Sequence, residues 1–582
     1  MKENSAFNYI KNLFQDFFKI KDTNDYDFTL ETSTNPIVNK SKESDINKLT
    51  LEDQTIKDNS PKKVFPMIDL NLEYMKVRYN SMINSDIQIR EFTLNARNRQ
   101  YKAFLVYIDG MTDQDIMNNY ILKPLMLKNT ANSFDGNQNK VISEVVTNNI
   151  TVRKIKKFDI AEYISSCLLP QNTLEKTSSF NDLVNGINAG NCALFIDTLD
   201  VAFNIEVKGF EKRSLDSPNN EIVIRGSQVG FTENLRTNTS LLRRYVNNEN
   251  LIIESTTLGA ISQTPCAICY LKNVANSDLI AEVKYRVNNL KIDYLISSGQ
   301  LEQLIQDNEN VSLPQLIPTE RPDRATNMLF EGRVVVIVNG SPYVLIAPAT
   351  FADFMNSPED LNVKHQYSNF IRVLRMVALF ISILLPGFYM AITNFHQELI
   401  PTELLFAIVA SRESVPFPIL FEILVMEFSF EIIREASIRV PNPIGPTLGI
   451  VGALILGQAA VDASIVSPIL IIIVSLTAIC SFAIPDLSLG FHARISRFIY
   501  IVLGAITGFL GIASGLIVHT AIICSMKSFG VSYIEPTIFT NTNSGKGIIL
   551  KPAWQREDRS EFLKTKRPKE QPKISMTWKY KY

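Results

Sequence analysis

The chain has 582 residues and a formal net charge of −1, with 46% hydrophobic and 20% charged residues. This length exceeds a single hydrophobic core, and a net charge near zero gives no sign of a nucleic acid partner, so none is expected. Six cysteines, spread between residues 167 and 524, exclude a disulfide framework in a chain of this size, which favours a reducing, cytoplasmic setting.

The apolar residues are concentrated toward the C-terminal end. Long uncharged runs recur from Met376 to Met526, whereas residues 1–365 have the mixed polar and apolar composition of soluble protein. The predicted fold class is therefore α+β with a membrane part. A cytoplasmic N-terminal region of two α/β lobes precedes a polytopic α-helical transmembrane domain.

Residues 1–62 are expected to form an amphipathic helix and a flexible tether. Apolar residues recur at helical spacing within residues 5–20, and this helix could dock on a partner, on a membrane surface or on its own domain. Residues 22–62 have the polar composition of a tether. The N-terminus carries no signal-peptide pattern, so we expect the soluble part to stay in the cytoplasm.

The first α/β lobe is expected at residues 63–170. Its strand-like runs are QIREFTL (88–94) and YKAFLVYI (101–108), between segments of helical period. A boundary is placed near residues 170–177, where the chain reads PQNTLEKT.

The second α/β lobe is expected at residues 171–365. The runs CALFID, FNIEV, EIVIRG and LIIESTT read as strands, and residues 233–248 and 281–307 read as helices. A hairpin, RVVVIVNGSPYVLIAP, is predicted to close the lobe, with Asn339 and Gly340 in its turn.

The transmembrane domain is expected at residues 366–526. A bilayer core of about 30 Å needs about 20 apolar residues per helix. The runs that qualify by length are 376–393, 444–461, 463–485 and 498–526. Residues 402–433 carry glutamates and are expected to form a broken or re-entrant element.

Positive charge predicts the orientation of the spans. Lys364, Arg372 and Arg375 precede the first run, and the basic tail within residues 527–582 carries a further excess of Lys and Arg, so both ends are expected inside. An even number of crossings follows, and four are favoured. That choice leaves four arginines on the outer side: Arg434, Arg439, Arg494 and Arg497. In the alternative, residues 414–433 cross, and the basic tail stays inside only if the last run doubles back.

Enzyme-like signatures occur only as fragments. PCAIC (265–269) and HQE (396–398) hold the pieces of a zinc deaminase pattern in reversed order, and a strand would point Cys266 and Cys269 to opposite faces. SGKG (544–547) lacks the spacing of a phosphate-binding loop. The four histidines are too far apart in sequence to suggest a shared metal site. We therefore expect no catalytic residues, no metal, no cofactor and no enzyme activity.

Four glycines in the last apolar run form two GxxxG pairs: Gly504, Gly508, Gly511 and Gly515. Such pairs allow a neighbouring helix to approach closely in lipid. The neighbour could belong to the same chain or to another subunit.

Residues 411–441, SRESVPFPILFEILVMEFSFEIIREASIRVP, carry charge within an apolar stretch. On a helix, Glu427, Glu431 and Glu435 step 40° apart and Arg439 continues the row. Ionised groups at bilayer depth face protein or water, so these residues predict an intramembrane polar network. Its expected members are Arg412, Glu413, Glu422, Glu427, Glu431, Arg434, Glu435 and Arg439. Arg412 is the nearest candidate partner for Glu422. The network could hold a broken helix together, form a polar path for ions, or re-pair during gating.

The same stretch, together with GPTLGIVGALILGQAAVDASIVSPILIIIV (445–474), resembles the A subunits of GerA-family spore germinant receptors. Upstream segments at 224–244, 293–308 and 318–351 agree, and the resemblance covers residues 170 to 570. One departure lies at residues 225–233, RGSQVGFTE, where the family usually has RGPREGFTE. The proline, the basic residue and the acidic residue of the family segment are missing from this loop.

The resemblance implies an integral protein of the spore inner membrane that transduces nutrient binding into the initiation of germination. It implies two partners, a transporter-like B subunit and a lipoprotein C subunit, as well as membrane lipid and a homo-oligomer that could conduct ions. A non-conducting scaffold that assembles the receptor, or a component of a transporter, is the alternative.

Overall fold

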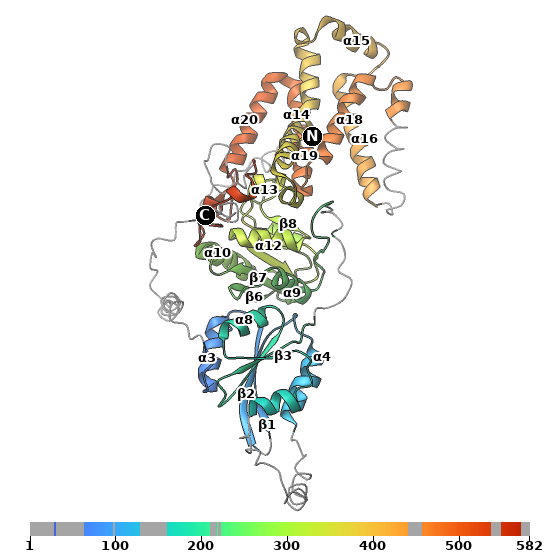
Figure 1. Ribbon diagram of the computed structural model, residues 1–582. Helices are drawn as coiled ribbons and strands as arrows, with labels where there is room; N and C mark the ends of the chain where they lie inside the picture. Colours follow the sequence, from blue (N-terminus) through green and yellow to red (C-terminus); the bar gives the residue numbers. More distant parts are fainter. Residues whose placement is uncertain are drawn as a thin grey trace, which may run out of the picture.

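The computed structural model describes residues 28–30, 63–96, 99–127, 160–209, 218, 221, 223–439, 457–536 and 549–571. Three parts are stacked in the order of the chain, with a sheet-containing lobe at one end, a second lobe in the middle and a set of helices at the other end (Figure 1). The expected helix at residues 5–20 and nearly all of the tether lie outside the described residues.

The first lobe is built on a five-stranded sheet of order β1-β2-β4-β5-β3, in which each pair of neighbours is antiparallel. Successive residues of a strand point to opposite faces, so Leu105 joins one core cluster while Phe104 and Val106 join another. The strands are β1 (Ile87–Ala96), β2 (Arg99–Ile108), β3 (Leu174–Thr177), β4 (Cys192–Ile196) and β5 (Ala202–Ile205).

Helices cover both faces of this sheet. One face carries α3 (Ile68–Arg78) and α8 (Phe180–Asn188). The other carries four short elements: η1 (Met117–Leu122), α5 (Lys123–Met126), α7 (Ile160–Tyr163) and η3 (Ile164–Leu168). The single turn α4 (Gln114–Ile116) leads into η1. The strands expected at 88–94 and 101–108 are confirmed.

The division between the two sheets does not lie at residue 170, where the sequence placed it. Strands β3, β4 and β5 complete the first sheet, and the second sheet begins at Leu251. The chain continues into the first sheet beyond residue 170 because β4 pairs with β2 at the centre of that sheet, where all five of its residues are buried. The segment EIVIRG, expected as a strand, contributes no strand among its described residues.

The second lobe has a five-stranded sheet of order β6-β7-β9-β10-β8, again with antiparallel neighbours. Its strands are β6 (Leu251–Leu258), β7 (Thr264–Leu271), β8 (Ile317–Thr319), β9 (Val334–Val338) and β10 (Val344–Ala347). The predicted hairpin is confirmed as β9 and β10. Cys266 and Cys269 lie in β7 and belong to core clusters on opposite faces of the sheet. Burial raises the pKa of the Cys266 thiol to about 12, which favours the thiol over a thiolate metal ligand.

The second sheet is also covered on both faces. One face carries α9 (Leu235–Tyr245) and α12 (Pro322–Glu331), and the other carries α10 (Ser277–Asn288) and α11 (Ser298–Ile305). The helix expected at 281–307 is therefore two helices separated by an irregular segment. Two short elements, α13 (Phe351–Met355) and η4 (Pro358–Leu361), lead toward the third part of the chain.

A buried ion pair joins the two lobes. Arg243 on α9 donates from Nε and Nη2 to the two carboxylate oxygens of Asp86, at 2.7 and 3.0 Å, and the side chains are only 2% and 8% exposed. Arg243 Nη2 also donates to Asn84 Oδ1 at 3.2 Å. A bidentate, desolvated contact of this kind fixes the relative orientation of two domains.

The third part consists of helices. They are α14 (His365–Phe395), η5 (Gln397–Leu399), α15 (Thr402–Arg412), α16 (Ile419–Arg439), α18 (Pro468–Phe482), α19 (Leu487–Thr507) and α20 (Phe509–Ser525). Among the described residues, α14 and α19 are long and apolar enough to cross a membrane, and α18 and α20 are shorter apolar helices. Most of the expected run 444–461 lies outside the described residues.

The last apolar run, expected as one span over 498–526, is a helical hairpin. α19 ends at Thr507 and α20 begins at Phe509, with Gly508 at φ +63° between them. Such a positive φ favours glycine because other residues are strained there. The turn could not be seen in the sequence because the apolar run continues through it. The hairpin is the reversal that the second topology required, the one in which residues 414–433 cross.

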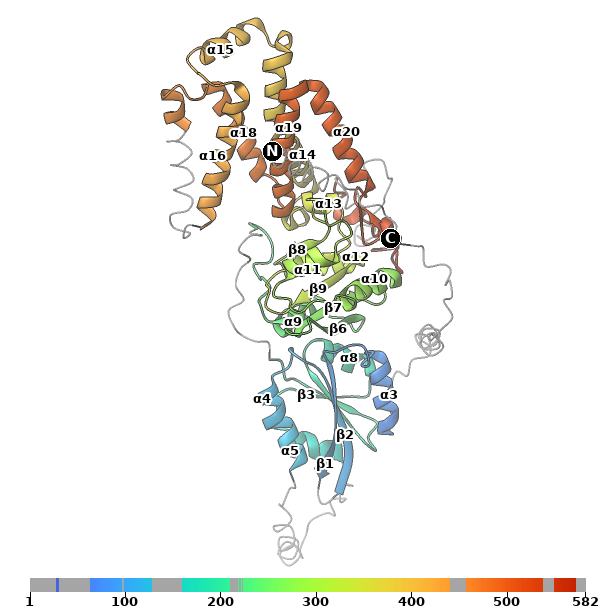
Figure 2. The same ribbon diagram turned by 180° about the vertical axis from the view of Figure 1, so that it is seen from behind.

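The helix directions follow from their contacts. Along α14 and α19 the residue numbers rise together, from the contact of Ser382 with Arg497 to that of Phe395 with Gly508. Along α16 and α18 they also rise together, as Figures 1 and 2 show, but in the opposite direction to α14. α20 runs antiparallel to α19, because Gly515 lies against Tyr500.

The C-terminal segment returns to the second lobe. β11 (Lys527–Ser528) and β12 (Val531–Ser532) form a small hairpin, followed by η6 (Ala553–Gln555) and η7 (Glu561–Leu563). Ser528 Oγ donates to the carbonyl oxygen of Gln315 at 2.6 Å. Both the start of α14 and the end of α20 therefore lie beside the second lobe (Figure 1).

Candidate functional site

Glu427 and Arg497 form a buried ion pair between α16 and α19. Arg497 Nη1 lies 2.6 Å from Glu427 Oε2, and the side chains are 2% and 0% exposed. Arg497 also donates from Nε to the carbonyl oxygen of Ser382 at 2.9 Å and from Nη2 to Ser382 Oγ at 3.2 Å. One guanidinium therefore connects α14, α16 and α19. Glu427 Oε1 is buried without a hydrogen-bond partner in the described part of the chain.

A second group of charges lies nearer the lobe end of α16. Glu431 Oε2 is 3.0 Å from Arg494 Nη1 on α19, and Glu431 Oε1 is 3.5 Å from Arg434 Nη1 on the same helix. Arg434 Nη2 donates to Ser481 Oγ of α18 at 2.7 Å, and its guanidinium lies 4.5 Å from the Phe482 ring centroid. These contacts tie α16 to both α18 and α19.

A third ion pair lies at the opposite end of α16. Arg412 Nη2 donates to Glu422 Oε1 at 3.2 Å, as expected from the sequence, and Glu422 is 1% exposed. Glu422 Oε2 accepts from the backbone N–H of Ser467 at 3.2 Å. This carboxylate therefore joins the end of α15 to the start of α18.

The remaining predicted members lie at the surface. Glu435 and Arg439 pair with each other at 2.6 Å, with side chains 62% and 77% exposed. Glu413 is exposed at the end of α15 and forms no ion pair within the described ranges. The predicted row of charges is thus divided, since its buried members find partners on other helices and its last members remain exposed.

The sequence did not indicate Arg494, Arg497 and Ser382 as members of the network. It placed the two arginines on the outer side, because the last apolar run was expected to be one span and α16 was not expected to cross. In the structure α19 brings both guanidinium groups to the carboxylates of α16. A network that joins α14, α15, α16, α18 and α19 can hold the helices in one arrangement, and it can change that arrangement by exchanging partners.

The predicted glycines lie at helix contacts within this chain. A Cβ on Gly504 would come within 2.6 Å of the Gly387 carbonyl oxygen of α14, so α14 and α19 approach backbone to backbone. A Cβ on Gly511 or Gly515 would meet Leu503 at 2.4 or 2.7 Å. Gly508 lies at the turn of the hairpin, against Phe395.

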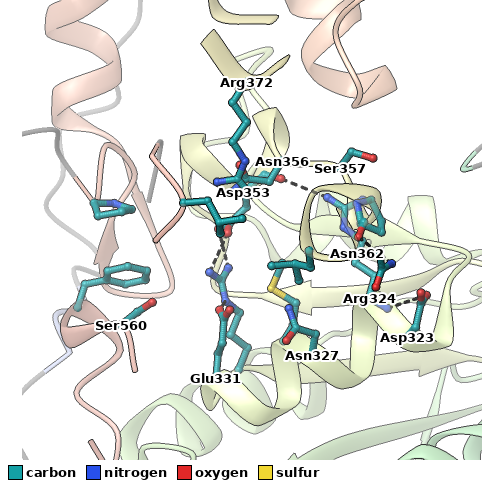
Figure 3. Close-up of a pocket in the computed structure, with 17 residues that line it drawn as sticks. Asp323, Arg324, Asn327, Glu331, Asp353, Asn356, Ser357, Asn362, Arg372 and Ser560 are labelled. Atoms are coloured by element: carbon teal, nitrogen blue, oxygen red, sulfur yellow. Dashed lines mark hydrogen bonds and ion pairs between the residues drawn. The ribbon is translucent and has the colours of Figure 1, made fainter. Parts of the chain in front are cut away.

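A cavity of about 230 Å³ lies where the second lobe, α14 and the C-terminal segment meet (Figure 3). Its arginines are already paired. Arg333 Nη1 and Nη2 donate to the Asp353 carboxylate at 2.7 and 2.9 Å, and Arg372 Nε donates to Asp360 Oδ2 at 3.1 Å. Ser560 of the C-terminal segment completes the wall. The cavity is therefore a charge-balanced junction between the lobe and the helices.

Glu302 lies on α11 of the second lobe, close enough to Asp486 to feel its charge. Burial, with a smaller contribution from the negative charge of Asp486, raises the pKa of Glu302 to about 7. Asp486 caps α19, where its side chain accepts from the backbone N–H of Leu489 at 3.0 Å. A carboxyl group that titrates near neutral pH thus lies at the base of α19.

Comparison with known proteins places the chain among spore germination proteins. The family described as Bacillus/Clostridium GerA spore germination protein matches residues 73–562. Spore germination protein KA of Bacillus subtilis is 37% identical over 504 residues, covering 86% of this chain and 88% of that protein. GerLA of Bacillus cereus is 34% identical over 491 residues, covering 84% of this chain and 94% of that protein.

A solved structure also matches. The N-terminal domain of the A subunit of the Bacillus megaterium spore germinant receptor GerK3 is 28% identical, with a TM-score of 0.35, covering 50% of this chain and 97% of that domain.

Proposed function

The chain belongs to the GerA family of spore germination proteins, and we propose that it is the A subunit of a nutrient germinant receptor in the spore inner membrane. The observation that carries this proposal is the family match over residues 73–562, which includes both lobes and the helical part. The role of the subunit is to convert nutrient binding into the initiation of germination. Its partners are a transporter-like B subunit, a lipoprotein C subunit and further copies of this chain.

The helix directions support a membrane topology with six crossings. α14 and α19 lead away from the second lobe, whereas α16, α18 and α20 lead toward it. Arg439 ends α16 near the lobe, and Ser467 lies beside Glu422 at the opposite end. The sequence predicts a span over the apolar run 444–461, most of which lies outside the described residues, and we count it as the sixth crossing.

This topology agrees with the distribution of positive charge. It brings Arg434, Arg439 and Arg494 to the lobe side of the bilayer, together with the basic C-terminal segment, and it needs no arginine cluster outside. α16 has 21 residues and is about 31 Å long, which matches the hydrocarbon core. We therefore propose six crossings in place of the four that the sequence favoured, with residues 419–439 crossing fully.

Signal transfer from the lobes to the membrane is proposed to run through α19. The base of this helix is capped by Asp486 against the second lobe, and its middle carries Arg494 and Arg497, which hold α16. A small displacement of α19 would change both ion pairs together. Because Glu427 retains an unpaired oxygen, it can accept a different partner without losing its first one.

Deletion of the gene tests the receptor role. Spores without this chain, in a background without related receptors, should fail to germinate in at least one nutrient, and expression of the chain should restore the response. A normal response to every nutrient in that background would overturn the proposal.

Ion conduction by an oligomer of this chain is the first of two candidate mechanisms. It is favoured by the buried, incompletely paired Glu427. A planar bilayer containing the purified receptor should show a current that Glu427→Gln or Glu431→Gln alters. Unchanged currents would remove these carboxylates from the conducting path.

The second candidate mechanism is a scaffold that assembles the receptor without conducting ions. It is favoured by the number of helices that the polar network joins. In that case the same substitutions would lower receptor abundance in proportion to the germination defect. A lost response at normal abundance would contradict a purely structural role.

A further inference from the structure

Two histidines that lie 27 residues apart meet between α19 and α20, with His492 Nε2 3.0 Å from His519 Nε2. On the far side of each ring, His492 Nδ1 lies 2.6 Å from Ser312 Oγ of the second lobe, and His519 Nδ1 lies 3.2 Å from the Tyr500 hydroxyl. Ser496 Oγ is 3.3 Å from His492 Nε2. The sequence separation of the histidines concealed this cluster.

These groups form one hydrogen-bonded chain from the lobe into the helices. A neutral imidazole has one donor and one acceptor nitrogen, and a hydroxyl group can act as either. When both rings are neutral, one Nε2 donates to the other, and Ser312 and Tyr500 satisfy the two Nδ1 atoms. Every ring nitrogen then has a partner, in either direction along the chain.

Protonation changes this balance. A doubly protonated pair would place two donors and two positive charges face to face. His492 is 8% exposed. Within the described residues, neither a carboxylate nor a guanidinium forms a hydrogen bond or an ion pair with either imidazole ring. The titratable groups that face the two rings are Tyr500 on α19 and the other histidine. A buried charge without a counterion is unfavourable, whereas an exposed imidazolium is readily hydrated.

We propose that His492 and His519 form a proton-binding site that latches the α19–α20 hairpin to the second lobe. The latch is closed when both rings are neutral and opens as they bind protons. The opening separates Ser312 from α19, and so changes the contact between the lobe and the helix that holds α16. This site is independent of whether the chain conducts ions or takes part in germination.

The size of the effect follows from linkage. A histidine that gains a proton only on opening, with the ordinary pKa of about 6.5, favours the open state about tenfold more at pH 5.5 than at pH 7.5. Two such histidines give about a hundredfold change. One remaining histidine gives about tenfold.

Hydrogen exchange of the purified full-length chain in lipid nanodiscs measures this opening. After correction for intrinsic exchange, peptides covering 308–316 and 509–525 of the wild type should lose about a hundredfold of their protection between pH 7.5 and 5.5. His519→Gln should reduce the change to about tenfold, and His492→Gln/His519→Gln should abolish it. His396→Gln is the matched control, because its ring stacks on Phe509 of α20 at 4.7 Å but lies outside the chain of hydrogen bonds.

A wild type without a pH step, or a double variant that retains the full step, would overturn the proposal. If the histidine variants do not fold, Ser312→Ala carries the test, since it removes only the bond to the lobe. It should raise exchange at 308–316 at pH 7.5 to the wild-type level at pH 5.5. A persisting pH step in that peptide of Ser312→Ala would contradict the latch.

Discussion

Replacement of Arg497 by methionine should strongly destabilise the helical part. The guanidinium forms its ion pair with Glu427 at 2.6 Å and two hydrogen bonds to Ser382, all in a buried position. Its removal leaves the Glu427 carboxylate at 0% exposure without a counterion. Breaking a buried pair from one side typically costs about 3–5 kcal/mol, whereas replacing both partners by apolar residues is often close to neutral.

A double-mutant cycle therefore tests the pair. Arg497→Met and Glu427→Leu should each lower the free energy of unfolding by about 3–5 kcal/mol, and the double variant should recover at least about 3 kcal/mol of the summed loss. SDS-driven unfolding in mixed micelles, followed by circular dichroism, provides the measurement. Glu435→Leu/Arg439→Met is the control, because this exposed pair should contribute less than about 1 kcal/mol. Additive losses, or single losses as small as those of the control, would refute the reasoning.

Three further predictions follow from the packing and titration of named residues. Gly504→Val should disrupt the contact with Gly387 and lower the free energy of unfolding by about 1–3 kcal/mol or more. Gly490→Ala should be tolerated, because a Cβ there meets nothing within 4 Å, and equal losses for the two variants in a thermal unfolding assay would contradict the close approach of α14 and α19. Because burial raises the pKa of Glu302 to about 7, its protonated form stabilises the fold below pH 4.5, and this contribution is lost as the pH rises through 7. Glu302→Gln should therefore flatten the decline in the free energy of unfolding between pH 4.5 and 7, and an unchanged pH profile would exclude Glu302 as its cause. Arg243→Met should leave the Asp86 carboxylate buried without its counterion and weaken the contact between the two lobes. Limited proteolysis should then cleave the variant faster than the wild type between residues 209 and 223, and equal cleavage rates would show that the ion pair does not fix the lobes.

Local structure could be predicted where the sequence pattern was itself local. The strands at 88–94 and 101–108 follow from alternating apolar residues, and the hairpin of β9 and β10 follows from Asn339 and Gly340 between two apolar runs. The pair of Arg412 and Glu422 could be anticipated because the residues are close in sequence.

The remaining contacts depend on which elements become neighbours. β4 joins the first sheet through its pairing with β2, and this long-range choice has no signal near residue 170. The turn at Gly508 was hidden within continuous apolar sequence, so the partners of Glu427 and Glu431 were hidden with it. The sequence thus identified the carboxylates of α16 but not the arginines of α19.

Germination of spores that carry Glu427→Gln tests the central claim most directly, namely that the charge on Glu427 serves signalling and not only folding. Glutamine keeps the shape of the side chain and an oxygen that can accept from Arg497, so it should disturb the fold less than leucine does, and the response is compared at equal receptor abundance. The account predicts a weakened or lost response to nutrient at equal receptor abundance, with a normal response for the exposed control Glu435→Gln. A normal response for Glu427→Gln, or a defect that only matches lost abundance, would contradict it.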